Sequence, residues 1–532
     1  MKYEYVYITA SVRGNKIKVE EVNGFFNSYG SIAELMFGLR DYKVEKVFMA
    51  DTQIQFSYLF DYAKREKKKL TKIITRGGSV YSFTMEGVRF VSCDYIYNAP
   101  FTALCRELNL GNPSGKAVHK LVGYIEDLGE DKFSFINGDY STIGALSWKW
   151  LSQGFCGIHT DVFGARYNNH FNMDDWDFFK KKHIYKGGLC LLNSKYRGKD
   201  MTNLYKYDKN SFFLWVMVSG NMPCGRYVKK KGKPQSLRDK VIHIRGNGIT
   251  KFPGIAALSI GVQPMEDFVD EDLWLWGDEL EELMNWYDFD VEWIEYLEWQ
   301  VNKPDSEFRK FALHFFPQKS AADGIRRRGV KLIINNSYGK WGENPVRSHF
   351  NYDKGQLTES KPFILYKSGV RSLAVASKIT ALARTELLRS IRTACRNQPD
   401  KYFVYGDTDS MILTIPLGED EIGENLGDFK FEGRWEKGVF LGKKCYLLYE
   451  EKEGYEAHAC GVNRASLQAA MVGKTWEEVR QFFDYDKEFM CPAIVSGEGG
   501  KYRTLVPRVI SKGYTNSNFN SISNAYEEGG IL

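Results

Sequence analysis

The chain has 532 residues, of which 43% are hydrophobic and 26% charged. This composition excludes wholesale disorder and predicts several folded domains. The net charge is +6, from 73 Lys and Arg against 67 Asp and Glu, which does not by itself demand a polyanionic partner. Nine cysteines include no C-x-x-C pair, which argues against a zinc ribbon and against a disulfide-dense secreted scaffold.

The first 165 residues or so alternate short β-like runs with helical ones. Residues 43–51 and 87–97 are typical of strands. Residues 57–69 and 141–151 have the apolar spacing of helices. We expect an α/β domain here. The N-terminus lacks a long apolar signal core, and the longest apolar run, residues 212–218, is too short for a membrane span. These features predict a soluble protein of the cytoplasm.

The chain also contains predicted loops and short runs of basic residues. Loops are predicted at residues 229–240 and, as a linker, at residues 496–503. Four short basic blocks could follow a phosphate backbone, although a solvated face explains each of them equally well. The blocks are Lys67–Lys69, Lys180–Lys182, Lys229–Lys231 and Arg326–Arg328.

A strand with an acidic end is predicted near residue 208. Residues 204–207 form the strand, Asp208 lies at its end, and an apolar segment follows directly.

Residues 319–341 predict a helix with a mixed polar face. Ser320 and Asp323 resemble a capping box, and Gly339 is a typical helix end. Four polar or aromatic residues lie within about 40° of Lys331 on the helix surface: Arg327, Lys331 itself, Asn335 and Tyr338. Cations suit a triphosphate, and an aromatic ring can stack on a base. An ordinary solvated basic face would explain the cations alone.

The strongest signal is the segment 401–415, in which two β-type runs flank Gly406-Asp407-Thr408-Asp409. The pattern predicts a β-hairpin with two carboxylates at its tip. Carboxylates two residues apart on an extended strand share a face, so both can approach one cation. With Asp208 they would form a three-carboxylate cluster of the kind that serves phosphoryl transfer with two metal ions. The alternative for the tip is an ordinary polar turn.

These three elements resemble motifs A, B and C of the family B DNA polymerases. The D-T-D of motif C is matched by residues 407–409, motif B by Lys331 with residues 335–339, and motif A by residues 208–214. Residues 185–188 are similar to the Y-x-G-G motif and residues 444–446 to the K-x-Y motif. All five occur in the family's order, and the length and spacing are similar to the protein-primed subgroup.

The resemblance implies a role for each matching residue. The catalytic residues and metal ligands would be Asp208, Asp407 and Asp409, with Asp407 assisting the other two. The nucleotide would be bound by Lys331, Arg327, Lys319, Asn335, Tyr338 and Phe213. Primer and template would contact Tyr185, Gly187, Gly188, Ser211, Thr408, Lys444 and Tyr446. Phe213 stands where the family has a Tyr that crowds the sugar 2′ position. The implied cofactor is two Mg²⁺ ions, which Mn²⁺ can replace.

The N-terminal region departs from the family's exonuclease motifs, which use four carboxylates. The D-x-E motif aligns with Val6-Tyr7-Ile8, the second motif with residues 51–55, and the third with residues 135–139. Only Asp139 remains of the four carboxylates, so we predict an exonuclease-like fold without proofreading. A slipped alignment is the alternative, in which a shifted site would use Glu4, Asp51, Asp61 and Asp94.

The resemblance implies a multidomain α/β and α+β architecture, with a right-hand polymerase behind an RNase H-like exonuclease-type domain. The expected regions are an exonuclease-like domain (1–165), a first palm segment (166–220), a first terminal-protein-region insertion (221–306), fingers (307–342), a second insertion (343–368), a second palm segment (369–483) and a thumb with the tail (484–532). The second insertion includes a predicted β-hairpin.

The implied activity is template-directed DNA synthesis with strand displacement, in the replication of a linear viral or plasmid genome. The implied partners are template and primer DNA, dNTPs and a terminal protein that supplies the priming hydroxyl, with the chain a monomer or a heterodimer with that protein. Three rival interpretations remain: an RNA-templated polymerase, a self-priming primase-polymerase of the same family, and a catalytically idle DNA-binding module. The paired acids of RNA-templated polymerases are adjacent, unlike Asp407 and Asp409.

Overall fold

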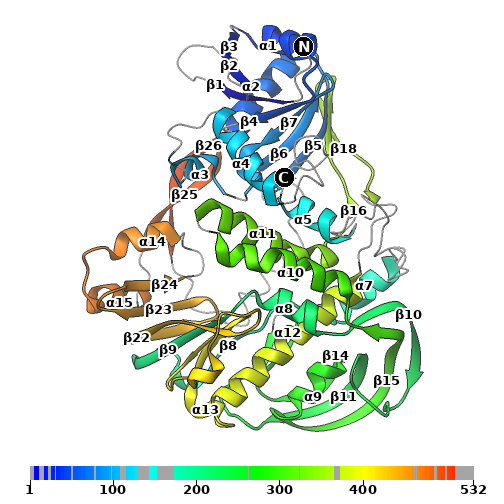
Figure 1. Cartoon of the computed structure of the whole chain (residues 1–532), viewed down its shortest axis with the longest axis vertical. Coiled ribbons are helices and arrows are strands. Elements are labelled where there is room, and N and C mark those ends of the chain that lie inside the picture. The colour runs from blue at the N-terminus through cyan, green and yellow to red at the C-terminus, as the bar shows by residue number, and fades with distance from the viewer. Residues whose placement is uncertain are drawn as a thin grey trace. The chain divides into compact units, whose positions relative to one another are not determined.

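The computed structural model of the chain divides into two compact units (Figure 1). One unit consists of residues 1–165 with 306–371, and the other of residues 166–305 with 372–532. The structure describes residues 5–10, 17–21, 26–29, 31–49, 52–76, 79–97, 99–107, 109, 115–128, 143–152, 173–261, 263–322, 324–344, 346–364, 372–459, 462, 464–484, 488–497 and 500–509.

The first unit is built on a mixed sheet with the strand order β18-β17-β5-β6-β7-β4-β1-β2-β3. Its strands are β1 (Tyr5–Ala10), β2 (Ile17–Glu21), β3 (Phe26–Tyr29), β4 (Lys46–Met49), β5 (Leu70–Arg76), β6 (Ser79–Met85), β7 (Val88–Ser92), β17 (Phe350–Asp353) and β18 (Gln356–Glu359). The strands β1, β4 and β7 pair in parallel, as expected of an α/β domain whose strands are connected by helices. The buried face of this sheet carries large apolar side chains such as Phe83 and Phe90, whose rings stack 4.9 Å apart.

The described residues of this unit also form helices α1 (Ile32–Asp41), α2 (Thr52–Arg65), α3 (Phe101–Glu107), α4 (Gly115–Leu128), α5 (Ile143–Ser152), α10 (Ser306–Ala321) and α11 (Gly324–Gly339). The short strands β16 (Val346–Arg347) and β19 (Phe363–Ile364) pair with each other. The predicted strands at 43–51 and 87–97, and the predicted helices at 57–69 and 141–151, are confirmed, with their ends displaced by one to five residues. The hairpin predicted in the second insertion is confirmed as β17–β18.

The second unit contains an antiparallel sheet with the strand order β24-β23-β22-β9-β21-β20-β8. Its strands are β8 (Cys190–Leu192), β9 (Met201–Lys209), β20 (Phe403–Asp407), β21 (Ser410–Leu413), β22 (Phe429–Gly442), β23 (Cys445–Glu450) and β24 (Gly454–His458). The apolar segment after Asp208 forms helix α8 (Phe212–Ser219). The other described helices of this unit are α7 (Met173–Lys181), α9 (Gly277–Leu283), α12 (Leu373–Ala394), α13 (Pro399–Tyr402), α14 (Arg464–Met471) and α15 (Trp476–Asp484).

A second sheet of this unit has the strand order β10-β15-β11-β14. Its strands are β10 (Met222–Lys231), β11 (Lys240–Thr250), β14 (Phe268–Trp276) and β15 (Tyr287–Lys303), and the short pair β12 (Leu258–Ile260) and β13 (Gln263–Met265) follows β11. The long helix α12 lies between this sheet and the seven-stranded sheet (Figure 1). Its residues Leu387 and Leu388 share one apolar core with Ile244 of β11 and Met411 of β21.

Three sequence predictions need correction. Residues 496–503 are not a linker, because 496–497 and 500–503 belong to the paired antiparallel strands β25 (Glu488–Gly497) and β26 (Gly500–Val509). The segment 319–339 is not one helix with a capping box, because Ser320 lies in the last turn of α10 and α11 begins at Gly324. Residues 229–231 are not loop, because they continue strand β10.

The basic block on β10 is largely neutralised by its neighbour strand. Lys229 pairs with Glu295 at 2.9 Å and Lys230 with Glu298 across the ladder to β15. Cross-strand pairs of opposite charge stabilise a sheet, so this block does not present its full charge to a ligand. Over the described ranges of the chain, no helix is both long enough and apolar enough to cross a membrane.

Candidate active site

The segment 403–413 forms the predicted hairpin. Strands β20 and β21 pair antiparallel with Asp407 opposite Ser410, so Thr408 and Asp409 alone make the turn. Thr408 has a φ of 63°, the left-handed conformation that tight two-residue turns require. Asp407 and Asp409 therefore do not share the face of one extended strand. That aspect of the prediction is wrong, because the chain reverses between the two residues.

The hairpin places its acids beside β9. Ser410 is opposite Asp208 of β9, and Asp407 is opposite Cys190 of β8. Residues that lie opposite each other in a ladder point to the same face of the sheet, so Asp208 and Asp407 are on one face with Ser410 between them. The backbone N–H of Lys209 donates to the carbonyl oxygen of Asp409 at 2.8 Å. The three predicted acids are thus brought together at one end of this sheet.

The donor set at this sheet end fits Mg²⁺. In proteins this ion is held by one or two carboxylates together with waters and substrate phosphates, rather than by a complete protein cage. Among the residues that the structure describes, no three His, Cys, Asp or Glu side chains form a group that could hold a metal ion, so the predicted three-carboxylate cluster is not formed as such. Asp208 and Asp409 can supply the carboxylate oxygens, and the assignment of metal ligands remains a prediction.

Asp407 is engaged by a lysine from another strand pair. Lys444, in the turn between β22 and β23, places its Nζ 3.0 Å from Asp407 Oδ2. The Thr408 hydroxyl donates to Asp407 Oδ1 at 3.0 Å. The backbone N–H of Lys444 donates to the Tyr405 hydroxyl at 2.9 Å. The structure therefore brings the predicted primer-binding lysine directly onto the D-T-D turn.

The tyrosine of the K-x-Y segment, Tyr446, is held by a glutamate. The Tyr446 hydroxyl donates to Glu456 Oε1 at 2.9 Å, and Glu456 also pairs with Lys206 of β9. Burial raises the pKa of Tyr446 above its usual range, so this hydroxyl stays protonated. Burial opposes the ionisation of Glu456, but Lys206 and the Tyr446 hydroxyl hold its pKa below the ordinary value.

The Y-x-G-G segment packs against the acidic turn. A Cβ atom at Gly188 would lie 2.6 Å from Thr408 Oγ1, and the Thr408 N–H donates to the carbonyl of Leu189 at 2.8 Å. A Cβ at Gly187 would meet no atom within 4 Å. Gly188 therefore has a packing reason to lack a side chain, whereas Gly187 has none of this kind.

A buried ion cluster holds the same segment from the other side. Arg384 of α12 donates to the carbonyl oxygens of Lys186 and Gly187 at 3.0 and 2.9 Å. Its remaining N–H groups make a bidentate pair with Glu279 of α9, with both distances 2.7 Å. Burial lowers the pKa of Lys186 to about 8, although Glu279 partly offsets this effect. None of these partners is recognisable from the sequence.

Motif A ends in an abrupt turn. The strand β9 ends at Lys209, and Ser211 has a φ of 47° at the start of α8. Phe213 lies in the first turn of α8 and is half-buried. The prediction of a strand ending in an acid, followed by an apolar segment, is confirmed, with the apolar segment helical.

The predicted nucleotide-binding residues of motif B lie in the other unit. Arg327, Lys331 and Asn335 are exposed on α11, on the side opposite the buried Gly329 and Ile333. Tyr338 is half-buried in the last turn of this helix, and α11 ends at Gly339 as predicted. Lys319 belongs to the last turn of α10. The common exposed face is confirmed, and the role of these residues remains a prediction.

No protein-family model matches the chain. Over 298 residues it is 26% identical to the DNA polymerase of Streptococcus phage Cp-1, with 51% of this chain and 50% of the relative covered. It is 27% identical to the DNA polymerase of Bacillus phage phi29 over 293 residues, with 50% of this chain and 48% of the relative covered. A shorter match, 30% identity over 168 residues, covers 27% of this chain and 29% of the DNA-directed DNA polymerase of Enterobacteria phage PRD1. The chain spans about half the length of the curated relatives that it matches first.

The likeness in structure extends over nearly the whole chain. The solved phi29 DNA polymerase in complex with primer–template DNA and incoming nucleotides has a TM-score of 0.77 and 17% identity, with 96% of this chain and 100% of that chain covered. The chain has the fold of this polymerase. The resemblance to the protein-primed family B DNA polymerases is confirmed. The predicted fold class, with a right-hand polymerase and an exonuclease-type domain, is confirmed with it.

The predicted exonuclease motifs lie only partly within the part of the chain that the structure describes. Asp139, the one predicted surviving carboxylate, and Asp51 lie outside the described residues. Val6 to Ile8 belong to strand β1. Asp94, an acid of the shifted alternative, accepts a hydrogen bond from the Phe101 N–H at 2.8 Å. Loss of proofreading therefore stays a prediction.

Sequence reasoning missed several residues that support the motifs of this polymerase fold: Glu279, Arg384, Tyr405 and Glu456. Glu279 and Arg384 lie far along the chain from the Y-x-G-G segment that they hold, and Glu456 belongs to no recognisable motif. Tyr405 could have been noticed, because it directly precedes Gly406 and the acidic turn. The other three carry no local signal.

Proposed function

We propose that the chain is a DNA-directed DNA polymerase that adds deoxynucleoside monophosphates to a 3′-hydroxyl and releases pyrophosphate. The observation that carries the proposal is the gathering of Asp208, Asp407 and Asp409 at one sheet end, with Lys444 and Gly188 packed on the same turn. The likeness to phage DNA polymerases in sequence and in fold supports it.

In this proposal Asp208 and Asp409 hold divalent metal ions, Mg²⁺ or, in its place, Mn²⁺. When bound, such ions lower the pKa of an attacking hydroxyl and neutralise charge on the phosphates. Asp407 assists by holding Lys444, whose side chain is 64% exposed and can turn toward a primer phosphate. Tyr446, fixed by Glu456, steadies the primer end beside it.

The remaining predicted residues complete the substrate contacts. Arg327 and Lys331, with Lys319, meet the triphosphate, because exposed cations are what this ligand needs. Asn335, Tyr338 and Phe213 line the nucleotide pocket, and an aromatic ring at position 213 excludes a ribose 2′-hydroxyl. The template and primer contacts are assigned to the remaining predicted set: Tyr185, Gly187, Gly188, Ser211 and Thr408.

We further propose that synthesis starts from a hydroxyl of a terminal protein and proceeds with strand displacement, in the cytoplasm of a host cell. The chain would act as a monomer or as a heterodimer with that protein. We also propose the domain boundaries predicted from the sequence, including the insertions at residues 221–306 and 343–368. Proofreading is proposed to be lost, since the aligned exonuclease motifs retain one carboxylate of four.

The test is primer extension with Mg²⁺ and dNTPs, comparing the wild type with Asp409→Ala. The matched control is Asp420→Ala, which removes an exposed acid of the same unit outside the site. We expect extension by the wild type and the control but none by Asp409→Ala, with DNA binding kept by all three. Extension by Asp409→Ala at near the wild-type rate would refute the site.

Two outcomes of the same assay separate the rival interpretations. Synthesis from an unprimed template without any partner would identify a self-priming enzyme. No extension from any DNA primer, followed by no labelling of a candidate terminal protein with dNTP, would identify an idle DNA-binding module. Metal-dependent shortening of a mismatched 3′ end in the absence of dNTPs would contradict the loss of proofreading.

A further inference from the structure

Lys209, the residue directly after Asp208, is a lysine buried in an unusual setting. Consecutive residues of a strand point to opposite faces, so its side chain leaves the sheet away from the Asp208 carboxylate. That side chain is 7% exposed. Its ammonium lies 4.6 Å from the ring centroid of Phe429, 5.0 Å from that of Trp215 and 5.8 Å from that of Phe212. A buried ammonium is costly unless it is paired.

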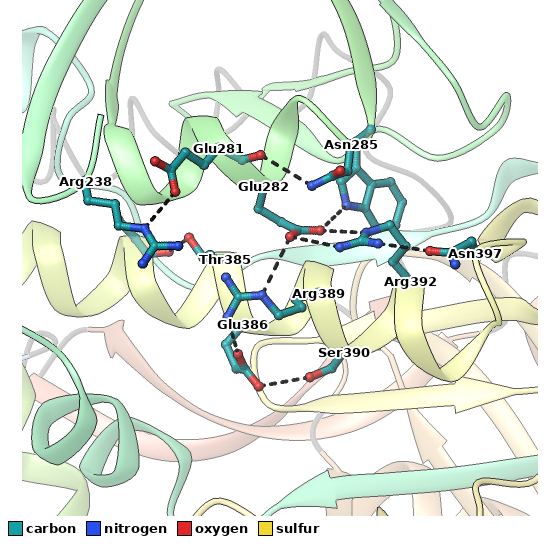
Figure 2. Close-up of polar contacts among 12 residues, drawn as sticks. Arg238, Glu281, Glu282, Asn285, Thr385, Glu386, Arg389, Ser390, Arg392 and Asn397 are labelled. Atoms are coloured by element: carbon teal, nitrogen blue, oxygen red, sulfur yellow. Dashed lines mark hydrogen bonds and ion pairs between the residues drawn. The ribbon is translucent and has the colours of Figure 1, made fainter. Parts of the chain in front are cut away.

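The partner of this ammonium is Glu386 of α12. Lys209 Nζ lies 2.8 Å from Glu386 Oε1. The other carboxylate oxygen of Glu386 accepts from Arg389 at 3.2 Å, and Ser390 donates to Glu386 Oε1 at 3.4 Å (Figure 2). Lys209 thus has one carboxylate and three aromatic faces around it, while Glu386 has additional donors on its own helix.

The pair of Lys209 and Glu386 is connected to a larger network of ion pairs between helices α12 and α9. Arg389 reaches Glu282 of α9 at 3.8 Å, and Arg392 pairs with the same carboxylate at 3.0 Å (Figure 2). The Trp286 indole N–H donates to Glu282 at 3.2 Å. Charges of alternating sign therefore run from Lys209 along α12 to α9, and they tie the end of β9 to a helix that is itself fixed at several points.

We propose that Lys209 is a positioning residue for Asp208, an inference that rests on the proposed polymerase function. The strand β9 ends at Lys209, and two residues later the chain turns through the left-handed Ser211. Asp208 is opposite Ser410 of β21 and Lys430 of β22, and only Lys209 follows it in the strand. Lys209 supplies two anchors: its N–H donates to the Asp409 carbonyl, and its ammonium is fixed on Glu386.

The experiment measures the rate constant of single-nucleotide addition as a function of Mg²⁺ concentration for Lys209→Met. We expect the Mg²⁺ concentration for half-maximal rate to rise about tenfold and the maximal rate to fall about tenfold to a hundredfold, as when a group that orients a metal ligand is removed. DNA affinity should stay close to that of the wild type, because the Lys209 side chain leaves the sheet on the face opposite Asp208.

The matched control is Lys378→Met on α12. Lys378 is also buried, pairs with Asp239 at 2.9 Å and with Asp278, and lies 4.9 Å from the ring centroid of Trp276. The same substitution there removes an ammonium from a similar environment but leaves β9 untouched. We expect a lower melting temperature for both variants and a shifted Mg²⁺ dependence only for Lys209→Met.

Two further variants separate positioning from stability. The double variant Lys209→Met/Glu386→Gln removes both charges, which often restores stability, and we expect its Mg²⁺ dependence to stay shifted. Glu386→Asp keeps the charge but shortens the reach, and decides the matter if the methionine variants do not fold. A wild-type Mg²⁺ dependence in any folded variant of this pair, or a shift in Lys378→Met, overturns the inference. Absence of synthesis by the wild type would refute the proposed function instead.

Discussion

Gly188→Ala is expected to disturb the D-T-D turn directly. The new methyl carbon would lie 2.6 Å from Thr408 Oγ1, 2.7 Å from its Cγ2 and 3.0 Å from its Cβ. Thr408 cannot swing away as a long side chain would, because it forms the turn itself with a φ of 63°. The hairpin tip must therefore move, at a cost of about 1–3 kcal/mol typical of overpacking. A displacement of Asp409 on the order of 1 Å lowers a catalysed rate about a hundredfold.

The assay combines thermal unfolding with single-nucleotide addition, and Gly187→Ala is the control. A Cβ at Gly187 has no neighbour within 4 Å, so this variant should unfold like the wild type. Removal of the opposing side chain in Gly188→Ala/Thr408→Gly should restore stability, since glycine accepts the left-handed turn. Equal melting temperatures and equal rates for Gly188→Ala and the wild type would refute the steric reasoning. An equal loss in Gly187→Ala would instead indicate a role shared by both glycines in contacting DNA.

Three other changes have defined outcomes. The pKa of Lys186 is lowered from 10.5 to about 8, so between these pH values the folded state binds fewer protons than the unfolded state. The free energy of unfolding should therefore rise with pH across that window in denaturant titrations, and this rise should vanish in Lys186→Met. Glu279→Gln leaves the buried Arg384 without its counter-charge and should lower the free energy of unfolding by about 3–5 kcal/mol in the same titrations. The control Glu281→Gln, whose partner Arg238 is 74% exposed, should lower it by less than about 1 kcal/mol. Similar losses in the two variants would contradict the burial argument. Lys444→Met should unfold at the wild-type temperature yet extend primers more slowly, and unchanged extension would show that its pair with Asp407 has no role in synthesis.

Much of the local structure followed from short sequence patterns. The β–turn–β pattern around residues 403–413 predicted the hairpin and its acidic tip, because turn chemistry and alternation act over a few residues. The spacing of Arg327, Lys331 and Asn335 predicted one exposed helix face, since a helix has a fixed period. The errors were also local: residues 496–503 have the composition of a linker, but residues 496–497 end strand β25 and residues 500–503 begin strand β26, which pairs with it.

The sequence by itself therefore determined which residues are predicted to carry the chemistry: the acids of motifs A and C, the cations of α11 and the glycines before β8. Only the tertiary structure decided how they are held. Lys209 meets Glu386, Arg384 meets the carbonyls of Lys186 and Gly187, and Glu456 meets Lys206, across separations of 177 to 250 residues. The sequence around a charged residue does not identify a distant partner, because the two residues meet only when the strands and helices pack. Burial then makes the pairing obligatory, because an unpaired charge in the interior is too costly to keep.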